Sequence, residues 1–153
     1  MIRALVLGLL FAGLALPAFT REFRAGDLVI EEPWARATPA GAGVGAGYMV
    51  IRNTGAAPDR LVGGDAAFAG RIEIHEMAMR DGIMRMRELA DGLEIPPGAA
   101  VTLEPGGYHV MFMQLEERLV EGEIRTMTLV FDDAGAVEIT LPVRGMAAGM
   151  HRD

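Results

Sequence analysis

The chain has 153 residues, 51% of them hydrophobic, and this length suits one domain with an apolar core of its own. Its formal net charge of −7 at pH 7 argues against nucleic acid or an anionic membrane surface as the partner. The sequence has no cysteine, which excludes disulfide bonds and any metal site that needs a thiolate ligand.

Residues 1–18 have the pattern of a secretory signal peptide. Arg3 supplies the positive charge near the N-terminus, and a short apolar run follows. Cleavage after Ala18 would put Leu16 at the minus-three position, where a small residue is preferred, and cleavage after Ala15 is a second possibility. The apolar run is too short to favour a transmembrane anchor. We therefore expect an exported, periplasmic protein whose mature form has no integral membrane segment.

Residues 19–143 predict a single all-β domain. Short runs rich in β-branched and aromatic residues recur between Gly, Pro and Asp, and none shows sustained helical periodicity with caps. Seven to nine strands at this spacing favour a two-sheet β-sandwich or a Greek-key barrel, with turns over 53–60 and 131–136. The remaining residues, 144–153, lack strand character, and we expect a flexible tail. The expected strands lie within 27–36, 46–55, 71–79, 83–89, 100–105, 108–115, 125–131 and 136–143.

Four methionines and a histidine crowd the segment HEMAMRDGIMRMRE, residues 75–88. Its central Asp81-Gly82 pair is typical of a two-residue type I′ hairpin turn, which fixes the register of the two strands. Directly opposed residues share a face of a hairpin, so one face would carry all of these side chains. The expected pairs on that face are Met79 with Met84, Met77 with Met86, and His75 with Glu88.

The segment GGYHVMFMQL, residues 106–115, repeats this pattern of histidine and methionine. In a strand, His109, Met111 and Met113 point to one face while the aromatic and aliphatic residues between them point to the other. The aromatic and aliphatic face is the natural core face. The two sets of histidine and methionine would converge if their strands are neighbours in the sheet.

Imidazole and thioether groups together favour Cu(I) over other biological metals. Thioether sulfur is soft and uncharged, which suits Cu(I) and makes it a poor ligand for Ca²⁺ or Mg²⁺. A blue-copper electron-transfer site is excluded because it needs a cysteine thiolate. Four neutral ligands around Cu(I) leave one positive charge, so such a site fits a protein that carries copper and releases it.

Other interpretations of the same residues remain open at this point. Met49 and Met127 fit ordinary core packing, and Met77, Met79, Met84 and Met113 would also serve as core or rim packing. In that case the chain would be a periplasmic β-sandwich for binding or interaction. Glu88 fits a solvated carboxylate or one that supports a ligand. We expect no catalytic residues, since no nucleophile, base and orienting group occur together.

The spacing of four of these residues resembles that of the periplasmic copper chaperone family PCuAC. His75 is followed by ten residues and Met86, then by twenty-two residues, His109, one residue and Met111. The flanking sequences DGIMRMRE, IPPGAAVTLEPGGYHVMFM and GYMVIRNTGAAPDRLVG are also similar to the family, and the likeness covers about residues 27–143.

The resemblance implies a cupredoxin-like β-sandwich that binds Cu(I) as a metallochaperone. Carried over residue by residue, the ligands would be His75, Met86, His109 and Met111. The family resemblance also implies a copper-accepting partner, either subunit II of respiratory cytochrome c oxidase, whose copper centre would be loaded, or another periplasmic copper chaperone. Some members carry extra methionine and histidine in a C-terminal tail, which Met146, Met150 and His151 would match unless the tail is inert.

Overall fold

A computed structural model describes residues 21–150, so the expected signal peptide over 1–18 and the tail residue His151 lie outside the described part. Within this range the chain forms eleven strands, and no helix there is long and apolar enough to cross a membrane. The strands are β1 (Glu22–Ala25), β2 (Leu28–Arg36), β3 (Val44–Asn53), β4 (Asp59–Asp65), β5 (Ala69–Arg80), β6 (Ile83–Glu88), β7 (Leu93–Ile95), β8 (Ala100–Leu103), β9 (Tyr108–Leu115), β10 (Ile124–Phe131) and β11 (Gly135–Arg144).

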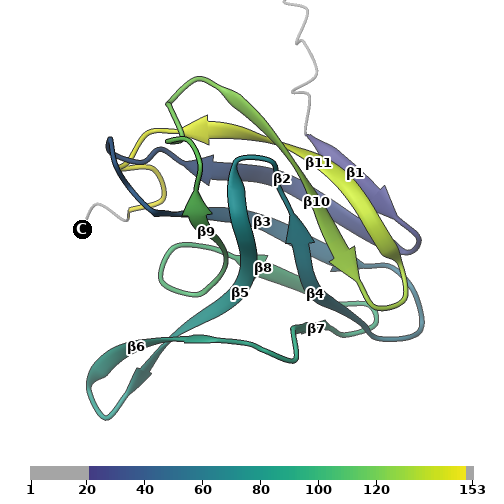
Figure 1. The fold of residues 1–153 in the computed structure, drawn as a ribbon. Helices are drawn as coiled ribbons and strands as arrows, with labels where there is room; N and C mark the ends of the chain where they lie inside the picture. The colour runs from purple at the N-terminus through teal and green to yellow at the C-terminus, as the bar shows by residue number, and fades with distance from the viewer. Residues whose placement is uncertain (1–20, 151–153) are drawn as a thin grey trace, which may run out of the picture.

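The strands form one open mixed sheet that folds over into two layers. Their order is β6-β5-β9-β8-β3-β2-β11-β10-β4-β7, with β1 added to β2 and β9 also paired with β3. In Figure 1, β11, β10 and β4 cross in front of the layer that contains β2 and β3. The parallel pairing of β2 with β11 joins the layers. The expected all-β, sandwich-like fold is confirmed.

The core lies between the layers and follows from the alternation of side chains along each strand. On β9, Val110 and Phe112 are fully buried on the inner face, as their period of two predicts. Phe112 packs edge-on against Phe68, with ring centroids 5.1 Å apart. From the other layer, Leu129 and Phe131 of β10 complete this apolar interior.

Three strands were absent from the sequence prediction. β1 and β7 span only four and three residues, too few for a clear alternating pattern. β4 contains the Gly63-Gly64 pair, which is typical of turns. Gly64 is tolerated in this strand because it lies against the backbone carbonyl of Thr128 on β10, where a side chain would clash.

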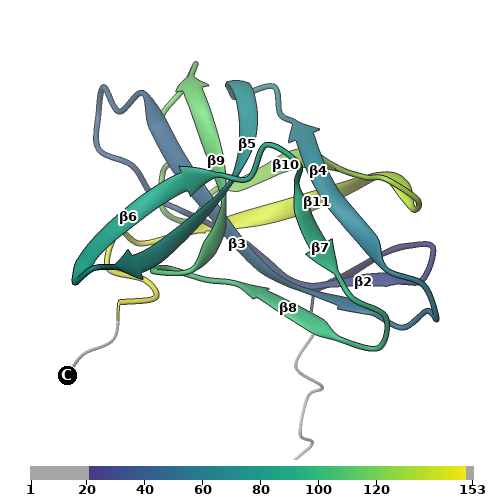
Figure 2. The same ribbon diagram turned by 90° about the horizontal axis from the view of Figure 1, so that it is seen from below.

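The hairpin of β5 and β6 has the register that the sequence predicts. Met79 pairs with Met84, Met77 with Met86, and His75 with Glu88. The turn residues Asp81 and Gly82 have φ values of 52° and 74°, and both are positive, as a type I′ turn requires. Figure 2 shows β6 and the end of β5 extending away from the rest of the sheet.

Candidate metal centre

The structure brings His75 and His109 together from two neighbouring strands. His75 on β5 is the direct cross-strand partner of His109 on β9, and their ring centroids lie 5.8 Å apart. Both residues are buried, at 9% and 5% exposure, although they lie on the face of the sheet opposite the apolar core. The two segments singled out in the sequence therefore meet, because β5 and β9 are neighbours.

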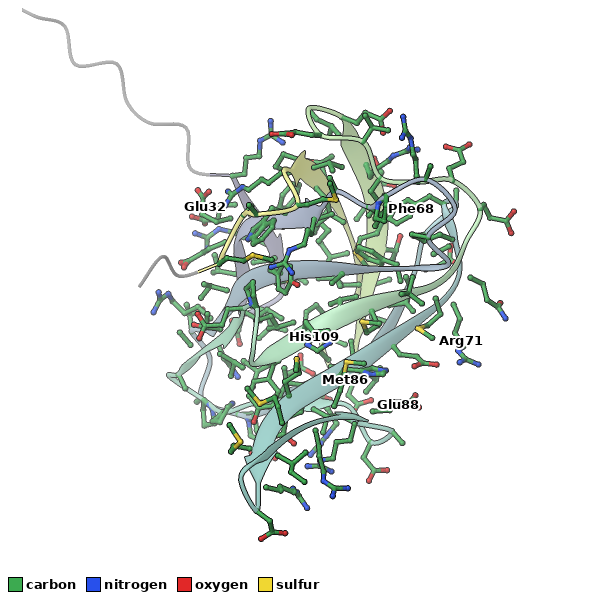
Figure 3. The ribbon with its side chains drawn as sticks, turned by 90° about the vertical axis from the view of Figure 1, so that its left-hand side faces the viewer. Glu32, Phe68, Arg71, Met86, Glu88 and His109 are labelled. Atoms are coloured by element: carbon green, nitrogen blue, oxygen red, sulfur yellow. The ribbon has the colours of Figure 1, made fainter. Side chains whose placement is uncertain are left out.

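Two methionines lie diagonally beside His75, one on each adjacent strand. Met111 on β9 faces Glu73, two residues before His75 on β5, and is 9% exposed. Met86 on β6 faces Met77, two residues after His75, and is 50% exposed. Figure 3 shows Met86 and His109 over adjoining parts of the sheet. The four expected ligands thus share one face, with three buried and one at the exposed edge.

Glu73 determines which ring nitrogen of His75 is available. Its Oε2 lies 2.7 Å from Nε2 of His75, and its other oxygen pairs with Arg71. The hydrogen bond from His75 is the largest cause that lowers the pKa of Glu73; burial opposes it and Arg71 assists it. Since an ionised carboxylate can only accept, Nε2 of His75 donates, and Nδ1 of the neutral ring keeps its lone pair. That Nδ1 is buried without a hydrogen-bond partner.

The sequence analysis missed Glu73. The alternation of side chains would have revealed it, because Glu73 and His75 are two residues apart on one strand and therefore share a face. The carboxylate expected from the sequence, Glu88, does lie opposite His75 on β6. Glu88 is exposed, which favours a solvated carboxylate over one that supports a ligand.

His109 is held through Nδ1, whereas His75 is held through Nε2. Nδ1 of His109 lies 3.0 Å from the carbonyl oxygen of Gly107, to which it donates, so Nε2 of the neutral ring keeps its lone pair. The same carbonyl accepts the backbone N–H of Met77 at 3.0 Å. Burial is the largest cause that lowers the pKa of His109 below its ordinary value of 6.5; the hydrogen bond to Gly107 opposes it, and the neighbouring His75 and Arg36 assist it. At neutral pH this imidazole is therefore uncharged and able to coordinate a metal.

Aromatic residues border the site on the side of β3. The ring of Tyr48 lies 6.5 Å from that of His109 and 4.5 Å from that of Trp34. The guanidinium of Arg36 stacks over Tyr48 at 5.3 Å and donates to the carbonyl of Ala148 at 3.0 Å. Tyr48 is therefore an aromatic neighbour of the buried His109 ring.

Five of the other methionines divide into three groups by their exposure. Met49 and Met127 are 2% exposed and belong to the core, as expected. Met113 is half-buried and pairs with Arg71, two positions beyond Met111 on β9. Met79 and Met84 are 63% and 48% exposed, so packing does not account for them.

The beginning of the C-terminal tail lies beside Trp34. Gly149 has a φ of +73°, and a Cβ at this position would lie 2.7 Å from Cγ of Pro105. Met146 and Met150 are both exposed. No hydrogen bond or ion pair of the described residues joins either methionine to the paired histidines.

The donor groups suit a soft, monovalent metal. Two imidazole nitrogens with free lone pairs and two thioethers provide four neutral donors, and the unpartnered Nδ1 of His75 is one of them. Among residues 21–150, no cluster of three or more His, Cys, Asp or Glu could hold a metal ion.

Comparison with known proteins places this chain in a family. The model of the family described as "Putative lipoprotein LpqE-like" matches residues 28–143. "Putative lipoprotein Lxx21020" from Leifsonia xyli subsp. xyli (strain CTCB07) is 32% identical over 145 residues, which cover 94% of this chain and 86% of that protein.

Two solved structures are similar in both sequence and fold. The copper-bound PCuAC domain from PmoF2 is 32% identical, with a TM-score of 0.70 over 82% of this chain and 98% of that one. The solution structure of CuI-DR1885 from Deinococcus radiodurans is 28% identical, with a TM-score of 0.60 over 73% and 74% of the two chains. The chain therefore belongs to the LpqE-like family, and its β-sandwich is a PCuAC domain.

Proposed function

We propose that this protein binds one Cu(I) ion through His75, Met86, His109 and Met111 and passes it to another protein. The observation that carries the proposal is the pairing of His75 with His109 on one sheet face, with an unpartnered buried nitrogen on His75. A buried polar atom without a hydrogen-bond partner is costly, and a bound metal would remove that cost.

The relatives support copper as the cargo. One similar structure is a copper-bound PCuAC domain and another is a Cu(I) form, so proteins of this fold have been observed with the metal. Thioether and imidazole donors independently favour Cu(I) over harder ions. The copper-bound relatives and the donor groups of this chain therefore support the same metal.

The arrangement of the ligands favours transport over storage. His75, His109 and Met111 are buried, whereas Met86 is half-exposed on the outermost strand β6. A partner can therefore approach the metal from the side of Met86 and replace one ligand before the others. Neutral ligands leave the ion with a net positive charge, which assists its release to a partner with anionic ligands. No catalytic step is part of this proposal.

The destination of the copper is proposed from the family resemblance. We propose an exported protein, directed by residues 1–18, that supplies the copper centre of cytochrome c oxidase, through subunit II or through another periplasmic copper chaperone. The description of the family and of its relative as lipoproteins supports export. Transfer of Cu(I) from this protein to a purified copper-binding domain of subunit II would test the step directly.

The ligand set is tested by anaerobic competition between the protein and a chromophoric Cu(I) chelator. Met86→Leu and Met111→Leu should each weaken Cu(I) binding at least tenfold, roughly 1.4 kcal/mol or more, because leucine fills the volume without donating sulfur. Met113→Leu is the matched control, since Met113 lies on the same face of β9 two residues beyond Met111. Equal losses in all three variants would refute this ligand set.

X-ray absorption provides a second test. The Cu(I) form should show mixed sulfur and nitrogen scattering, and Met86→Leu or Met111→Leu should reduce the sulfur contribution. A shell of oxygen and nitrogen alone would leave the β-sandwich without a soft-metal site. The methionines would then need another explanation, such as a binding surface for a protein partner.

A further inference from the structure

Three methionines that the proposed copper site does not use gather on the same face of the hairpin. We call Met77, Met79 and Met84 the outer methionines. Met79 and Met84 are 63% and 48% exposed, and Met77 is half-buried between them and the proposed site. Met79 and Met84 gain little of the free energy that burial of an apolar side chain provides, so packing does not explain their presence.

The hairpin does not need these methionines in order to fold. Its turn is specified by Asp81 and Gly82, both of which have the positive φ that the turn requires. On its other face, Arg87 and Glu76 form an ion pair with a Nε–Oε2 distance of 2.8 Å. Every residue of β6 is exposed, so neither face of this strand is covered by the domain.

The register places three thioethers within reach of one ion. Met79 and Met84 are directly opposed, and such pairs have Cβ atoms about 4.5–5.5 Å apart. Met77 lies two residues before Met79 on the same face, about 7 Å along the strand. Methionine has a long, unbranched side chain that adapts its shape, so all three sulfurs can turn towards a common point.

The outer methionines also adjoin the proposed copper site. Met77 is the direct cross-strand partner of Met86, which is the exposed ligand of that site. The thioethers therefore form a continuous series along the hairpin, from Met79 and Met84 at the turn to Met86 beside His75. An ion could move along this series by exchanging one sulfur at a time.

We propose that the outer methionines form a second site for a soft monovalent cation, Cu(I) in the periplasm, through which copper reaches and leaves the histidine site. The site is argued from the hairpin alone, whereas its part in copper transfer rests on the proposed function. It binds more weakly than the histidine site because it lacks imidazole ligands and lies in water. A weak site at the surface suits exchange with a partner.

Silver(I) provides the test of the second site, because it is a soft cation of the same charge and is stable in air. Titration of the protein with Ag(I), followed through the methyl signals of ¹³C-labelled methionine, should show two steps. The signals of Met86 and Met111 should shift with the first ion and those of the outer methionines with the second. In the variant Met77→Leu/Met79→Leu/Met84→Leu, the stoichiometry should fall from two ions to one.

A matched control separates this site from the tail. Met146 and Met150 are 56% and 62% exposed, similar to the outer methionines, but lie after β11. Met146→Leu/Met150→Leu should keep both ions. Loss of the second ion in this control, with the triple variant unchanged, would place the second site in the tail and overturn the proposal.

The outcomes also separate this proposal from the proposed function. Failure of any ion to bind tightly at His75 and His109 would refute the copper-carrier function. Tight binding of a single ion, with no shift of the outer methyl groups at excess Ag(I), would refute only the second site and leave the exposed methionines as a surface for a protein partner. Circular dichroism would check that the triple variant keeps its fold.

The role in transfer is tested by kinetics. Transfer of Cu(I) from the loaded protein to an anionic chelator in stopped flow should slow at least threefold in the triple variant, while the equilibrium affinity of the histidine site stays the same. An unchanged transfer rate would overturn the transfer role.

Discussion

One hydrogen bond on each histidine ring leaves a different nitrogen free in His75 and in His109. Glu73 accepts a hydrogen bond from Nε2 of His75, whereas the carbonyl of Gly107 accepts one from Nδ1 of His109. The free lone pair is therefore on Nδ1 in the first ring and on Nε2 in the second. Since such partners orient a metal ligand, these two acceptors would hold the proposed ligands in place before a metal arrives.

The position of Glu73 leads to a prediction about affinity. Glu73→Gln should weaken Cu(I) binding by about 10- to 100-fold, because the neutral amide holds the His75 ring less firmly than the carboxylate does. A competition titration against a Cu(I) chelator measures the effect. The ring nitrogen signals of His75 in ¹⁵N NMR should also show a changed balance between the two tautomers, which a purely structural role would not cause.

Glu88→Gln is the control for this prediction. Glu88 lies opposite His75 on β6 but is exposed, so its charge is screened by water. The control should bind Cu(I) within about threefold of the original protein. An equal loss in both variants would mean that general negative charge, and not the contact with His75, supports the site.

At the scale of single elements, the close approach of β3 to β9 depends on glycine. Gly47 lies opposite Val110 in this pairing, and a Cβ on Gly47 would lie 2.8 Å from Cζ of Phe112. Phe112 is fully buried and cannot move without disturbing the core. The same two strands carry Tyr48 and His109 on the opposite face, so their packing also positions the site.

Gly47→Ala should therefore destabilise the protein by about 1–3 kcal/mol through overpacking. Urea unfolding followed by fluorescence of Trp34 measures the loss. Gly43→Ala is the matched control, because a Cβ there meets no atom within 4 Å, and its effect should stay within about 0.5 kcal/mol. Unchanged stability of Gly47→Ala would show that the Phe112 ring can shift at no cost.

Elements specified by neighbouring residues were predictable from the sequence, and contacts between distant elements were not. The register from His75 to Glu88 follows from two turn residues, Asp81 and Gly82. The pairing of His75 with His109 depends on β5 and β9 being adjacent, which no local pattern determines. The sequence therefore predicted two suitable strand faces, and only the folded chain shows that they meet.

The same distinction applies to Glu73 and to β4. The contact of Glu73 with His75 is local and could have been anticipated from their spacing. The Gly63-Gly64 pair is extended because β4 lies along β10, a strand more than sixty residues further along the chain. Tertiary pairing here overrides the turn preference of two glycines.

At the scale of the whole molecule, the apolar core stabilises the fold without the metal. The core lies between the two layers, whereas the four proposed ligands occupy the opposite face of β5, β6 and β9. The proposed metal site is thus an addition to the domain, and we expect the domain to fold without it. Copper that binds only the native state adds stability by mass action, about 2.7 kcal/mol at a hundredfold excess over Kd.

The Cu(I) form should therefore melt at a higher temperature than the apo form at neutral pH. Protons compete with copper for both imidazoles, so the difference should shrink as the pH falls. The apo form should itself lose stability below pH about 6.5, since His109 has a lowered pKa when folded and the unfolded chain then binds more protons. Differential scanning calorimetry between pH 5 and 8 measures both trends.

The variant His75→Leu/His109→Leu should fold, and its melting temperature should rise far less with Cu(I) than that of the original protein, because only the weaker site of the outer methionines remains. Its apo form should also lose less stability on acidification, because the buried imidazole is gone. A copper-induced rise of the original size in this variant would place the stabilising copper away from the two histidines. The candidates would then be the outer methionines and the tail with Met146, Met150 and His151.

The position of Met86 on an edge strand has a kinetic consequence. β6 is hydrogen-bonded to β5 alone, and all of its residues are exposed, so the hairpin can open locally while the rest of the sheet stays intact. Each such opening would remove Met86, one of the four proposed ligands, from the metal. The lifetime of the bound ion is then set by the local opening of a single hairpin. This opening costs far less free energy than global unfolding does. Amide hydrogen exchange in β6 and the dissociation rate of copper would report the same event.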